Sequence, residues 1–427
     1  MKVYLNSIGC RLNQSEIERY ANQFRAAGHS LATAPEGADL VVVNTCAVTA
    51  EAASDSRQKI RQAARGAPGR LVVTGCWSTL DPAQAQALPG VTDVVTNASK
   101  DGLVPDLLGM PSESFDLEPL ARQPLPGIHL RTRAFIKAQD GCDQHCTYCV
   151  TRVARGPSRS RPIEDVVADV QLALRGGAKE IVLSGVQLGA WGADLPGGLR
   201  LMHLAGAILG QTDVPRLRFS SLEPWDVDER FLGLWQDARM CRHLHLPLQS
   251  GSDDTLRRMA RKLRTEGYAR VVELARQAIP NVAITTDIIA GFPGESDEEF
   301  EESLAFIERM AFAAGHVFTY SARAGTPAAR FPAQVAHPLR KERNARVREV
   351  LQESTYRYQT AFLNATLPVL WEAADQVGPD GWHTSGLTDN YLRVRSVSPS
   401  ALWNTISQVR LDAVRADGLV GTILPPA

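Results

Sequence analysis

Three cysteines in the segment GCDQHCTYC, residues 141–149, form the most specific chemical pattern in this sequence. Cys142, Cys146 and Cys149 have the spacing Cys-x3-Cys-x2-Cys. A structural zinc ion or an electron-carrying iron-sulfur cluster normally takes four protein ligands, whereas a metal that binds a substrate keeps one position open. Three closely spaced thiols therefore indicate a catalytic metal site with one position left for a second molecule.

Two other ligand sets would give these thiols a structural role. His145 could complete a zinc site, but it directly precedes Cys146, and adjacent side chains cannot easily aim at one ion. Cys241 could complete a four-cysteine cluster, but it precedes the strand-like run HLHLPL and so falls at the opposite end of a strand. We expect Cys241 to be a packed core residue, and both alternatives stay open at this point.

A second set of three cysteines is spread along the first part of the chain. Cys10 ends KVYLNSIGC, Cys46 ends LVVVNTC and Cys76 ends LVVTGC, so each thiol follows a strand-like run. If these runs form one parallel sheet, all three thiols lie at its carboxyl edge, where open α/β sheets bind ligands. Free cysteine is also among the most buried residue types, so three merely buried thiols are the alternative. We favour a shared metal site.

Strand-like and helix-like runs alternate around Cys10, Cys46 and Cys76, and they predict the elements that position these thiols. Residues 1–110 contain the strand-like runs KVYLNSIG, LVVVNT, LVVTG and DVVTN, separated by helical stretches. This alternation predicts an N-terminal domain with an open parallel sheet covered by helices. The proline-rich residues 111–132 are expected to form a linker.

Six further strand-like runs predict the fold around Cys142. They are AFIKAQ, EIVLSG, RLRFSS, HLHLPLQ, AITTDII and HVFTYSA, with helical stretches between them. Six βα units within residues 133–360 predict a partial (β/α)6 barrel, because a full barrel of eight units usually needs about 250 residues. Such barrels place their chemistry at the carboxyl ends of the strands, where Cys142 falls. Short β-like runs in residues 361–427 predict a small C-terminal all-β barrel.

The composition is that of a soluble globular protein, with 44% hydrophobic and 22% charged residues. The formal net charge of -1 gives no global attraction to nucleic acid or membrane, so a polyanion would need a local patch. The segment MKVYLNSIGC lacks a basic region followed by an apolar run, and no stretch approaches the about 18 apolar residues of a membrane span. We expect a cytoplasmic protein, in which seven cysteines are metal ligands, catalytic groups or core residues.

The motif CDQHCTYC on the first strand of a partial barrel resembles the radical S-adenosylmethionine (SAM) enzymes. Together with GCRLNQSE, NTCAVT, TGC and ARGPSRSRP, it is similar to the methylthiotransferases of that superfamily. The resemblance implies two 4Fe-4S clusters, one on each cysteine triplet, with SAM on the iron that Cys142, Cys146 and Cys149 leave free. It also implies that the C-terminal barrel is a TRAM-like module that binds RNA.

The motifs LSGVQLGAWG, RFSSLEP and LTDNYLRV are most similar to the MtaB-type branch of this family. That branch converts N6-threonylcarbamoyladenosine, next to the anticodon of tRNA, into its 2-methylthio derivative. The resemblance implies a tRNA anticodon stem-loop as partner, a flavodoxin or ferredoxin as electron donor, and no membrane or DNA partner. SAM would serve twice, as methyl donor and as source of a radical that takes the hydrogen at C2 of adenine.

Three other functions remain as alternatives. Related branches of the family modify isopentenyladenosine in tRNA or an aspartate of a ribosomal protein, and the same scaffold would serve each. A third alternative comes from another class: a non-catalytic, metal-containing RNA-binding protein whose cysteines are structural. Formation of 5'-deoxyadenosine from SAM on reduction separates this third alternative from the enzymes.

Polar residues near the ends of the barrel strands are the candidate ligands of SAM. The resemblance places Tyr148 near the adenine of SAM, and it leads us to expect that Glu223 and Gln249 contact SAM. Ordinary strand capping or loop hydrogen bonding is the alternative for each candidate. The full set of expected SAM-binding residues is Tyr148, Ser184, Gly185, Gln187, Ser221, Glu223, Gln249 and Asp287.

Two arginine-rich segments are candidate RNA contacts. The first follows the cluster loop and contains Arg152, Arg155, Arg159 and Arg161. The second, RRMARKLR at 257–264, is expected to be a basic helix, and either segment could track the phosphates of an anticodon stem. The C-terminal region is slightly acidic, so its aromatic residues would have to bind RNA by stacking or else form its core. These aromatic residues are Trp371, Trp382 and Tyr391.

Overall fold

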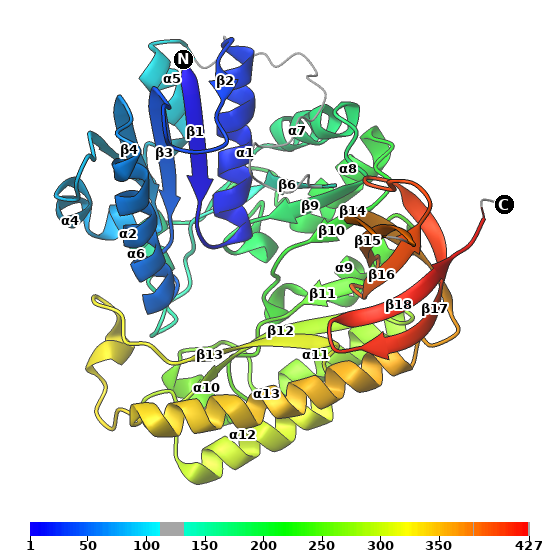
Figure 1. Ribbon diagram of the computed structural model, residues 1–427. Helices are drawn as coiled ribbons and strands as arrows, with labels where there is room; N and C mark the ends of the chain where they lie inside the picture. The colour runs from blue at the N-terminus through cyan, green and yellow to red at the C-terminus, as the bar shows by residue number, and fades with distance from the viewer. Residues whose placement is uncertain (112–131, 379, 426–427) are drawn as a thin grey trace.

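The computed structural model describes residues 1–111, 132–378 and 380–425, and its β-strands form three main groups (Figure 1). The N-terminal sheet has the strand order β2-β1-β3-β4-β5, and every pair in it is parallel. Its strands are β1 (Lys2–Ser7), β2 (Ser30–Leu31), β3 (Leu40–Thr45), β4 (Arg70–Gly75) and β5 (Asp93–Val95). The open parallel sheet expected from the sequence is confirmed.

Helices cover both faces of the N-terminal sheet because its central strand is apolar on both sides. In β3, Val41 and Val43 pack with α2 (Ala50–Arg65), while Leu40 and Val42 pack on the other face. That second face is covered by α1 (Arg11–Ala26) and α5 (Leu103–Leu108). Side chains alternate between the faces of a strand, so an uninterrupted run of apolar residues requires two covering layers. Three short helices complete this part: α3 (Cys76–Leu80), α4 (Pro82–Gln86) and η1 (Lys100–Gly102).

Six parallel strands form the central partial barrel. They lie in two sheets, β10-β9-β6 and β11-β12-β13, which the isolated parallel bridge between Ser221 and His245 joins. The strands are β6 (Arg133–Lys137), β9 (Glu180–Ser184), β10 (Leu217–Phe219), β11 (His243–His245), β12 (Ala283–Ala290) and β13 (Ala314–Thr319). All six coincide with strands predicted from the sequence, and the partial (β/α)6 barrel is confirmed.

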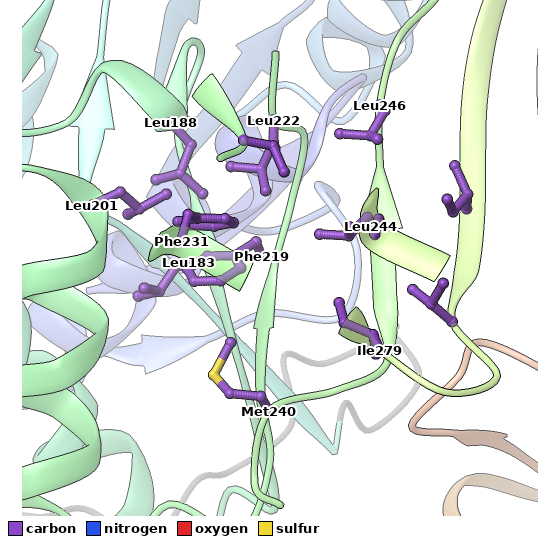
Figure 2. Packing of buried hydrophobic residues seen from close by; sticks show 14 of the residues in the cluster. Leu183, Leu188, Leu201, Phe219, Leu222, Phe231, Met240, Leu244, Leu246 and Ile279 are labelled. Atoms are coloured by element: carbon purple, nitrogen blue, oxygen red, sulfur yellow. The ribbon is translucent and has the colours of Figure 1, made fainter. Parts of the chain in front are cut away.

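Helices pack around this barrel and enclose its core. The helices are α7 (Ile163–Arg175), α8 (Leu201–Gln211), α9 (Glu229–Leu232), α10 (Asp253–Arg258), α11 (Thr265–Ala278), α12 (Asp297–Met310) and α13 (His337–Thr360). Short 3-10 turns connect them at η3 (Leu188–Ala190), η4 (Pro224–Asp226), η5 (Gly233–Gln236) and η6 (Pro327–Arg330). Phe219 of β10 lies beside Phe231 of α9 in this core (Figure 2). The centroids of the two rings are 5.2 Å apart. Leu183 of β9 and Leu244 of β11 extend into the same core from strands on either side of β10.

The C-terminal part is a closed five-stranded barrel with the order β14-β15-β16-β18-β17. Its strands are β14 (Thr366–Gly378), β15 (Gly381–Thr388), β16 (Arg393–Ser398), β17 (Ile406–Arg415) and β18 (Gly418–Ile423). Trp371 and Val394 are fully buried in its core. The all-β prediction is confirmed, although β15 and β18 carry too many glycine and polar residues to be recognised from sequence.

The predicted linker and the presence of membrane-spanning helices are the two remaining questions about the fold. The predicted linker at 111–132 falls almost entirely outside the described residues. Among the helices of the described ranges, none has the length and apolar character that crossing a bilayer requires.

Candidate functional site

The three N-terminal cysteines lie at the carboxyl edge of neighbouring strands. Cys10 precedes α1 after β1, Cys46 directly follows β3, and Cys76 begins α3 directly after β4. From β1 the chain adds β2 on one side of the sheet and then β3, β4 and β5 on the other side. The gap between β1 and β3 is therefore a topological switch point, where open α/β sheets bind their ligands. The loops are in close contact, because a Cβ atom on Gly9 would lie 2.4 Å from the Sγ atom of Cys46.

The surroundings of these N-terminal thiols suit a metal cluster. Burial raises the pKa of Cys46 to about 11, so this thiol holds its proton until a metal displaces it. The backbone N–H of Val48 lies 3.5 Å from the Cys46 sulfur, and the side-chain amide of Asn97 lies 3.7 Å from the Cys76 sulfur. Such N–H donors stabilise cluster thiolates, so these residues fit a 4Fe-4S group.

The second triplet occupies the loop between β7 (Gln139–Asp140) and α6 (Thr151–Arg155). Gly141 enters this loop at a φ of 73°, and the N–H of Cys142 donates to the carbonyl of Gly156 at 3.1 Å. The backbone N–H of Gln144 donates to the Cys142 sulfur at 3.4 Å, and the N–H of Thr151 donates to the Cys149 sulfur at the same distance. These contacts also fit a cluster of thiolates.

Within the described ranges, no three His, Cys, Asp or Glu side chains converge as ligands of one metal ion. In a 4Fe-4S cluster each protein thiolate binds a different iron, so its ligands need not converge on one point. His145 lies against Arg152, with its Nδ1 atom 2.6 Å from the guanidinium. Cys241 is 1% exposed in the core, as expected, and its sulfur lies 3.8 Å from a carboxylate oxygen of Glu180, so it is not placed at the triplet.

A buried glutamine braces the cluster loop, and sequence reasoning missed it. The side-chain amide of Gln139 donates to the carbonyl of Gly141 at 2.8 Å and to the hydroxyl of Ser158 at 2.9 Å. Its oxygen accepts from the N–H of Gln187 at 2.9 Å. Gln139 is fully buried, so this one side chain ties the cluster loop to the loop after β9. A polar residue inside the apolar run AFIKAQ was the available signal.

Arg155 stands at the centre of a buried group of charges between the N-terminal sheet and the barrel. Its guanidinium lies 2.9 Å from Asp140 and 3.2 Å from Glu16, and it donates to Asn13 at 2.7 Å. Lys100 lies 2.5 Å from Glu16. Burial alone would raise the pKa of Asp140, but Arg155, Lys100 and a further lysine outweigh burial and hold that pKa well below its usual range.

This group of charges joins the two cysteine sites. Glu16 belongs to the helix that follows Cys10, whereas Asp140 lies two residues before Cys142. A second connection runs through Asn97, whose amide contacts the Cys76 sulfur and donates to the carbonyl of Ala154 at 2.7 Å. The contacts on both sides therefore fix the position of one triplet relative to the other.

Comparisons with known proteins agree with this arrangement. Residues 136–307 match the model of the radical SAM superfamily, and residues 2–97 match that of the uncharacterized protein family UPF0004. The chain is 36% identical to the threonylcarbamoyladenosine tRNA methylthiotransferase MtaB of Bacillus subtilis, over 92% of this chain and 89% of the relative. It is 35% identical to the protein of the same name from Thermotoga maritima, over 87% of this chain and 86% of the relative. The chain belongs to the radical SAM methylthiotransferase family.

Two further likenesses are weaker. The methylthiotransferase is 31% identical to a tRNA-2-methylthio-N(6)-dimethylallyladenosine synthase of Geobacillus kaustophilus, over 100% of this chain and 83% of the relative. The structure of the radical SAM methyltransferase TsrM from Kitasatospora setae aligns with a TM-score of 0.58 at 15% identity, covering 77% of both chains. This structural likeness shows the fold alone.

The expected SAM-binding residues of the methylthiotransferase lie around the barrel mouth. Gln187 lies beside the cluster loop, with its side-chain oxygen 3.3 Å from the Cys142 sulfur. Asp287 lies 3.3 Å from the ring of His245, and the N–H of Gln249 donates to the carbonyl of Asp287 at 2.8 Å. The remaining candidates lie at the carboxyl ends of β9 and β10 or in the cluster loop: Tyr148, Ser184, Gly185, Ser221 and Glu223.

Arg261 was expected on a basic surface helix, but it lies elsewhere in the structure. The segment 257–264 is not a basic helix, because α10 ends at Arg258 and α11 begins at Thr265. Arg261 is 6% exposed, pairs with Glu223 at 2.6 Å and lies 4.0 Å from the Cys146 sulfur. Its place is therefore at the cluster loop of the methylthiotransferase, and this corrects its assignment to an RNA-binding patch.

The four arginines after the cluster loop divide into two groups. Arg155 is 4% exposed and fully engaged, so the expectation that it contacts phosphate is wrong. Arg161 is partly buried and pairs with Asp169 at 2.6 Å. Arg152 and Arg159 lie at the surface, where they stay candidates for RNA contact. The arginine-rich segment, which looked like an exposed surface in the sequence, thus contains a buried residue, Arg155, whose partners Asn13 and Glu16 come from a distant segment.

Two of the three C-terminal aromatic side chains are engaged within the methylthiotransferase. Trp371 is fully buried in the C-terminal barrel, so the core alternative is the correct one for it. Tyr391 stacks on His243 of the central barrel, with ring centroids 4.1 Å apart and an interplanar angle of 5°. Trp382 is partly exposed in β15 and keeps its candidate role in stacking.

Proposed function

We propose that this enzyme converts N6-threonylcarbamoyladenosine next to the anticodon of tRNA into its 2-methylthio derivative. The observation that carries the proposal is the 36% identity to the MtaB of Bacillus subtilis over 92% of this chain. The lower identity of 31% to a dimethylallyladenosine-modifying relative favours the threonylcarbamoyl nucleoside. The two cysteine triplets, joined by one buried group of charges, support sulfur insertion beside a radical site.

The proposal includes two resident 4Fe-4S clusters, one on Cys10, Cys46 and Cys76 and one on Cys142, Cys146 and Cys149. Together with SAM, the second cluster supplies a 5'-deoxyadenosyl radical when it is reduced. The remaining chemistry of the site belongs to residues of this chain. In this proposal Glu223 and Gln187 orient SAM, supported by the 2.6 Å pair of Glu223 with Arg261 and by the 3.3 Å distance from the Gln187 side-chain oxygen to the Cys142 sulfur.

Several finer assignments belong to the same proposal. The eight expected SAM-binding residues keep that role, and the chain divides into domains at 1–110, 133–360 and 361–427. The C-terminal barrel acts as a TRAM-like RNA-binding module, and a flavodoxin or ferredoxin supplies electrons. The enzyme works in the cytoplasm, where its tRNA substrate is found.

The test is an anaerobic assay of the reconstituted enzyme with SAM, a chemical reductant and tRNA that carries N6-threonylcarbamoyladenosine. Mass spectrometry of the digested nucleosides should show the 2-methylthio derivative and an accumulation of 5'-deoxyadenosine. The Cys142→Ala variant is the control and should form neither product. A wild-type enzyme that modifies only tRNA carrying isopentenyladenosine would refute the nucleoside assignment, and absence of 5'-deoxyadenosine would support the non-catalytic alternative.

A further inference from the structure

The side-chain amide of Asn97 connects the two cysteine sites through the hydrogen bonds of one nitrogen atom. Asn97 follows β5, and its Nδ2 atom lies 3.7 Å from the Cys76 sulfur and 2.7 Å from the carbonyl oxygen of Ala154. An amide nitrogen carries two hydrogens, so it can donate to both acceptors at once. All three residues are buried, so both contacts lie inside the protein.

Asn97 is also tied to the helix that carries Cys76. Its backbone N–H donates to the hydroxyl of Thr79 at 2.9 Å, and this hydroxyl donates to the carbonyl of Gly75 at 2.8 Å. Cys76 and Thr79 both belong to α3. The side chain of Asn97 therefore approaches the Cys76 sulfur from a backbone that is fixed to the same helix. An outer contact of this kind can orient a metal ligand and tune the metal that it holds.

The second acceptor, Ala154, lies in the short helix that follows the barrel cysteines. The N–H of Thr151, at the beginning of α6, donates to the Cys149 sulfur at 3.4 Å. The N–H of Ala154 donates to the carbonyl of Val150 at 3.0 Å, which closes the same helical turn. One turn of helix and one asparagine side chain thus connect a sulfur of the barrel triplet to a sulfur of the N-terminal triplet.

The other two N-terminal sulfurs have contacts of a different kind. Cys46 lies beside a backbone N–H, that of Val48, whereas the Cys10 sulfur lies 3.7 Å from the side-chain oxygen of Asn13. A substitution does not remove a backbone donor, and the oxygen of Asn13 is not a donor to a thiolate. The donor of Asn97 belongs to a side chain, so its effect on the N-terminal triplet can be measured by substitution.

We propose that Asn97 is a positioning residue of the sulfur-inserting site and acts through Cys76. Its N–H stabilises negative charge on the Cys76 thiolate and so raises the reduction potential of the N-terminal cluster, because a reduced cluster carries more negative charge. Its bond to Ala154 holds Cys76 at a fixed place relative to the cluster loop of the barrel. The inference rests on the proposed function and deepens it by naming a residue that links the radical site to sulfur insertion.

The first test is a redox titration of the reconstituted holoenzyme followed by electron paramagnetic resonance. SAM is present, because it changes the signal of the barrel cluster and so distinguishes that signal from the N-terminal one. Asn97→Leu keeps the size of the side chain but removes the donor. At a fixed potential it should lower the ratio of reduced to oxidised N-terminal cluster about tenfold, which is a shift of about 59 mV. Asn97→Asp has the natural shape with a carboxylate oxygen in place of the donor, and it should lower the potential at least as far.

Asn390→Leu is the matched control. Asn390 is also a fully buried asparagine, and its amide donates to the hydroxyl of Tyr358 at 3.2 Å, but it lies between β15 and β16 of the C-terminal barrel. This substitution should lower the stability of the protein without changing the reduction potential of the N-terminal cluster. Iron per chain shows whether each variant holds both clusters. If Asn97→Leu loses iron, the potential of Asn97→Asp decides.

The two products of the reaction give a second readout. With tRNA that carries N6-threonylcarbamoyladenosine, Asn97→Leu should form 5'-deoxyadenosine at close to the wild-type rate, because the barrel cysteines are unchanged. The yield of methylthio product per 5'-deoxyadenosine should fall at least about tenfold, since small displacements of a reacting group cost this much or more. A merely structural role of Asn97 would instead lower both products together.

The outcomes separate this inference from the proposed function. An unchanged reduction potential in both Asn97 variants at full iron content would overturn the role of Asn97, and so would a parallel fall of both products. Methylthiolation by wild type would leave the proposed function intact in either case. A lowered potential in the Asn97 variants, with no methylthio product from wild type, would support the contact to Cys76 and refute the proposed function.

Discussion

At the scale of single residues, Arg155 shows how much of a site depends on distant partners. Its carboxylate and amide partners Glu16, Asn13 and Asp140 fix it between the N-terminal sheet and the barrel. Two of these partners precede it by more than a hundred positions, so no local pattern in RVARGPSRSR could reveal the contact. The cysteines were predictable from sequence because their spacing and their places after strands are local properties.

Replacement of Arg155 by methionine should be strongly destabilising. The substitution would remove the guanidinium that pairs with the buried carboxylates of Glu16 and Asp140. Removal of one partner of a buried ion pair costs about 3–5 kcal/mol. The free energy of unfolding, measured by urea denaturation of the anaerobic enzyme, should fall by about this amount. The exposed Arg159→Met is the control and should change it little. Equal effects of the two substitutions would show that the buried charges are not coupled as described.

Asp226 gives a prediction with a defined pH dependence. Burial raises the pKa of this carboxyl group to about 6, and the nearby Glu223 adds to the rise. The folded state therefore binds this proton more tightly than the unfolded state. Its favourable contribution is complete below the unfolded pKa of about 4 and is lost as the pH rises through 6.

Asp226→Asn should accordingly stabilise the protein at alkaline pH. We expect a gain of about 1–2 kcal/mol in the free energy of unfolding at pH 8, after allowance for partial exposure of the side chain. The gain should shrink steadily as the pH falls toward 4, where the aspartic acid is neutral in both states. Urea denaturation midpoints of wild type and variant at a series of pH values give the measurement. A gain that does not vary with pH would rule out the raised pKa.

At the scale of elements, the six barrel strands were predictable because each is a short apolar run that ends in polar or small residues. The hairpin of β7 and β8 (Arg159–Ser160) was not, since its two-residue strands carry no periodic signal. Gly141 is the residue that makes this hairpin possible. It has a φ of 73°, and a Cβ atom there would lie 1.8 Å from the carbonyl oxygen of Pro157.

Gly141→Ala should therefore disrupt the cluster loop. The alanine would have to move the backbone at Pro157, which is held beside the loop that carries Cys142. We expect the variant to retain about half of the wild-type iron after reconstitution, because only the barrel triplet is affected. Gly197→Ala is the matched control: Gly197 also has a positive φ, of 89°, but no atom lies within 4 Å of its Cβ position.

The control isolates the cost of the backbone angle alone, which is about 1 kcal/mol for a residue other than glycine. Gly197→Ala should keep its full iron content. Full iron in Gly141→Ala would mean that the loop tolerates the displacement and that its geometry does not depend on this glycine.

At the scale of the whole molecule, two interfaces fix the position of the three parts. The buried charges around Arg155 hold the N-terminal sheet against the barrel. The C-terminal barrel is held by Arg242, which pairs with Asp389 at 2.6 Å, and by Tyr391 stacked on His243. The sequence predicted the class of each part, but it could not predict the interfaces, because they consist of single long-range pairs with no periodic pattern.

The consequence of these interfaces is that both cysteine triplets occupy fixed places, one at the carboxyl edge of the N-terminal parallel sheet and the other in the loop between β7 and α6. Each thiol triplet belongs to its own set of strands and is anchored by its own N–H donors. Loss of one set of thiols should therefore leave the other set able to bind iron.

Iron and acid-labile sulfide per chain after anaerobic reconstitution test this account most directly. We predict about eight irons in wild type and about four in the Cys142→Ala/Cys146→Ala/Cys149→Ala variant, with the same fall for the corresponding triple variant of Cys10, Cys46 and Cys76. About four irons in wild type, unchanged when the three N-terminal thiols are removed, would contradict the account, because those thiols would then hold no cluster.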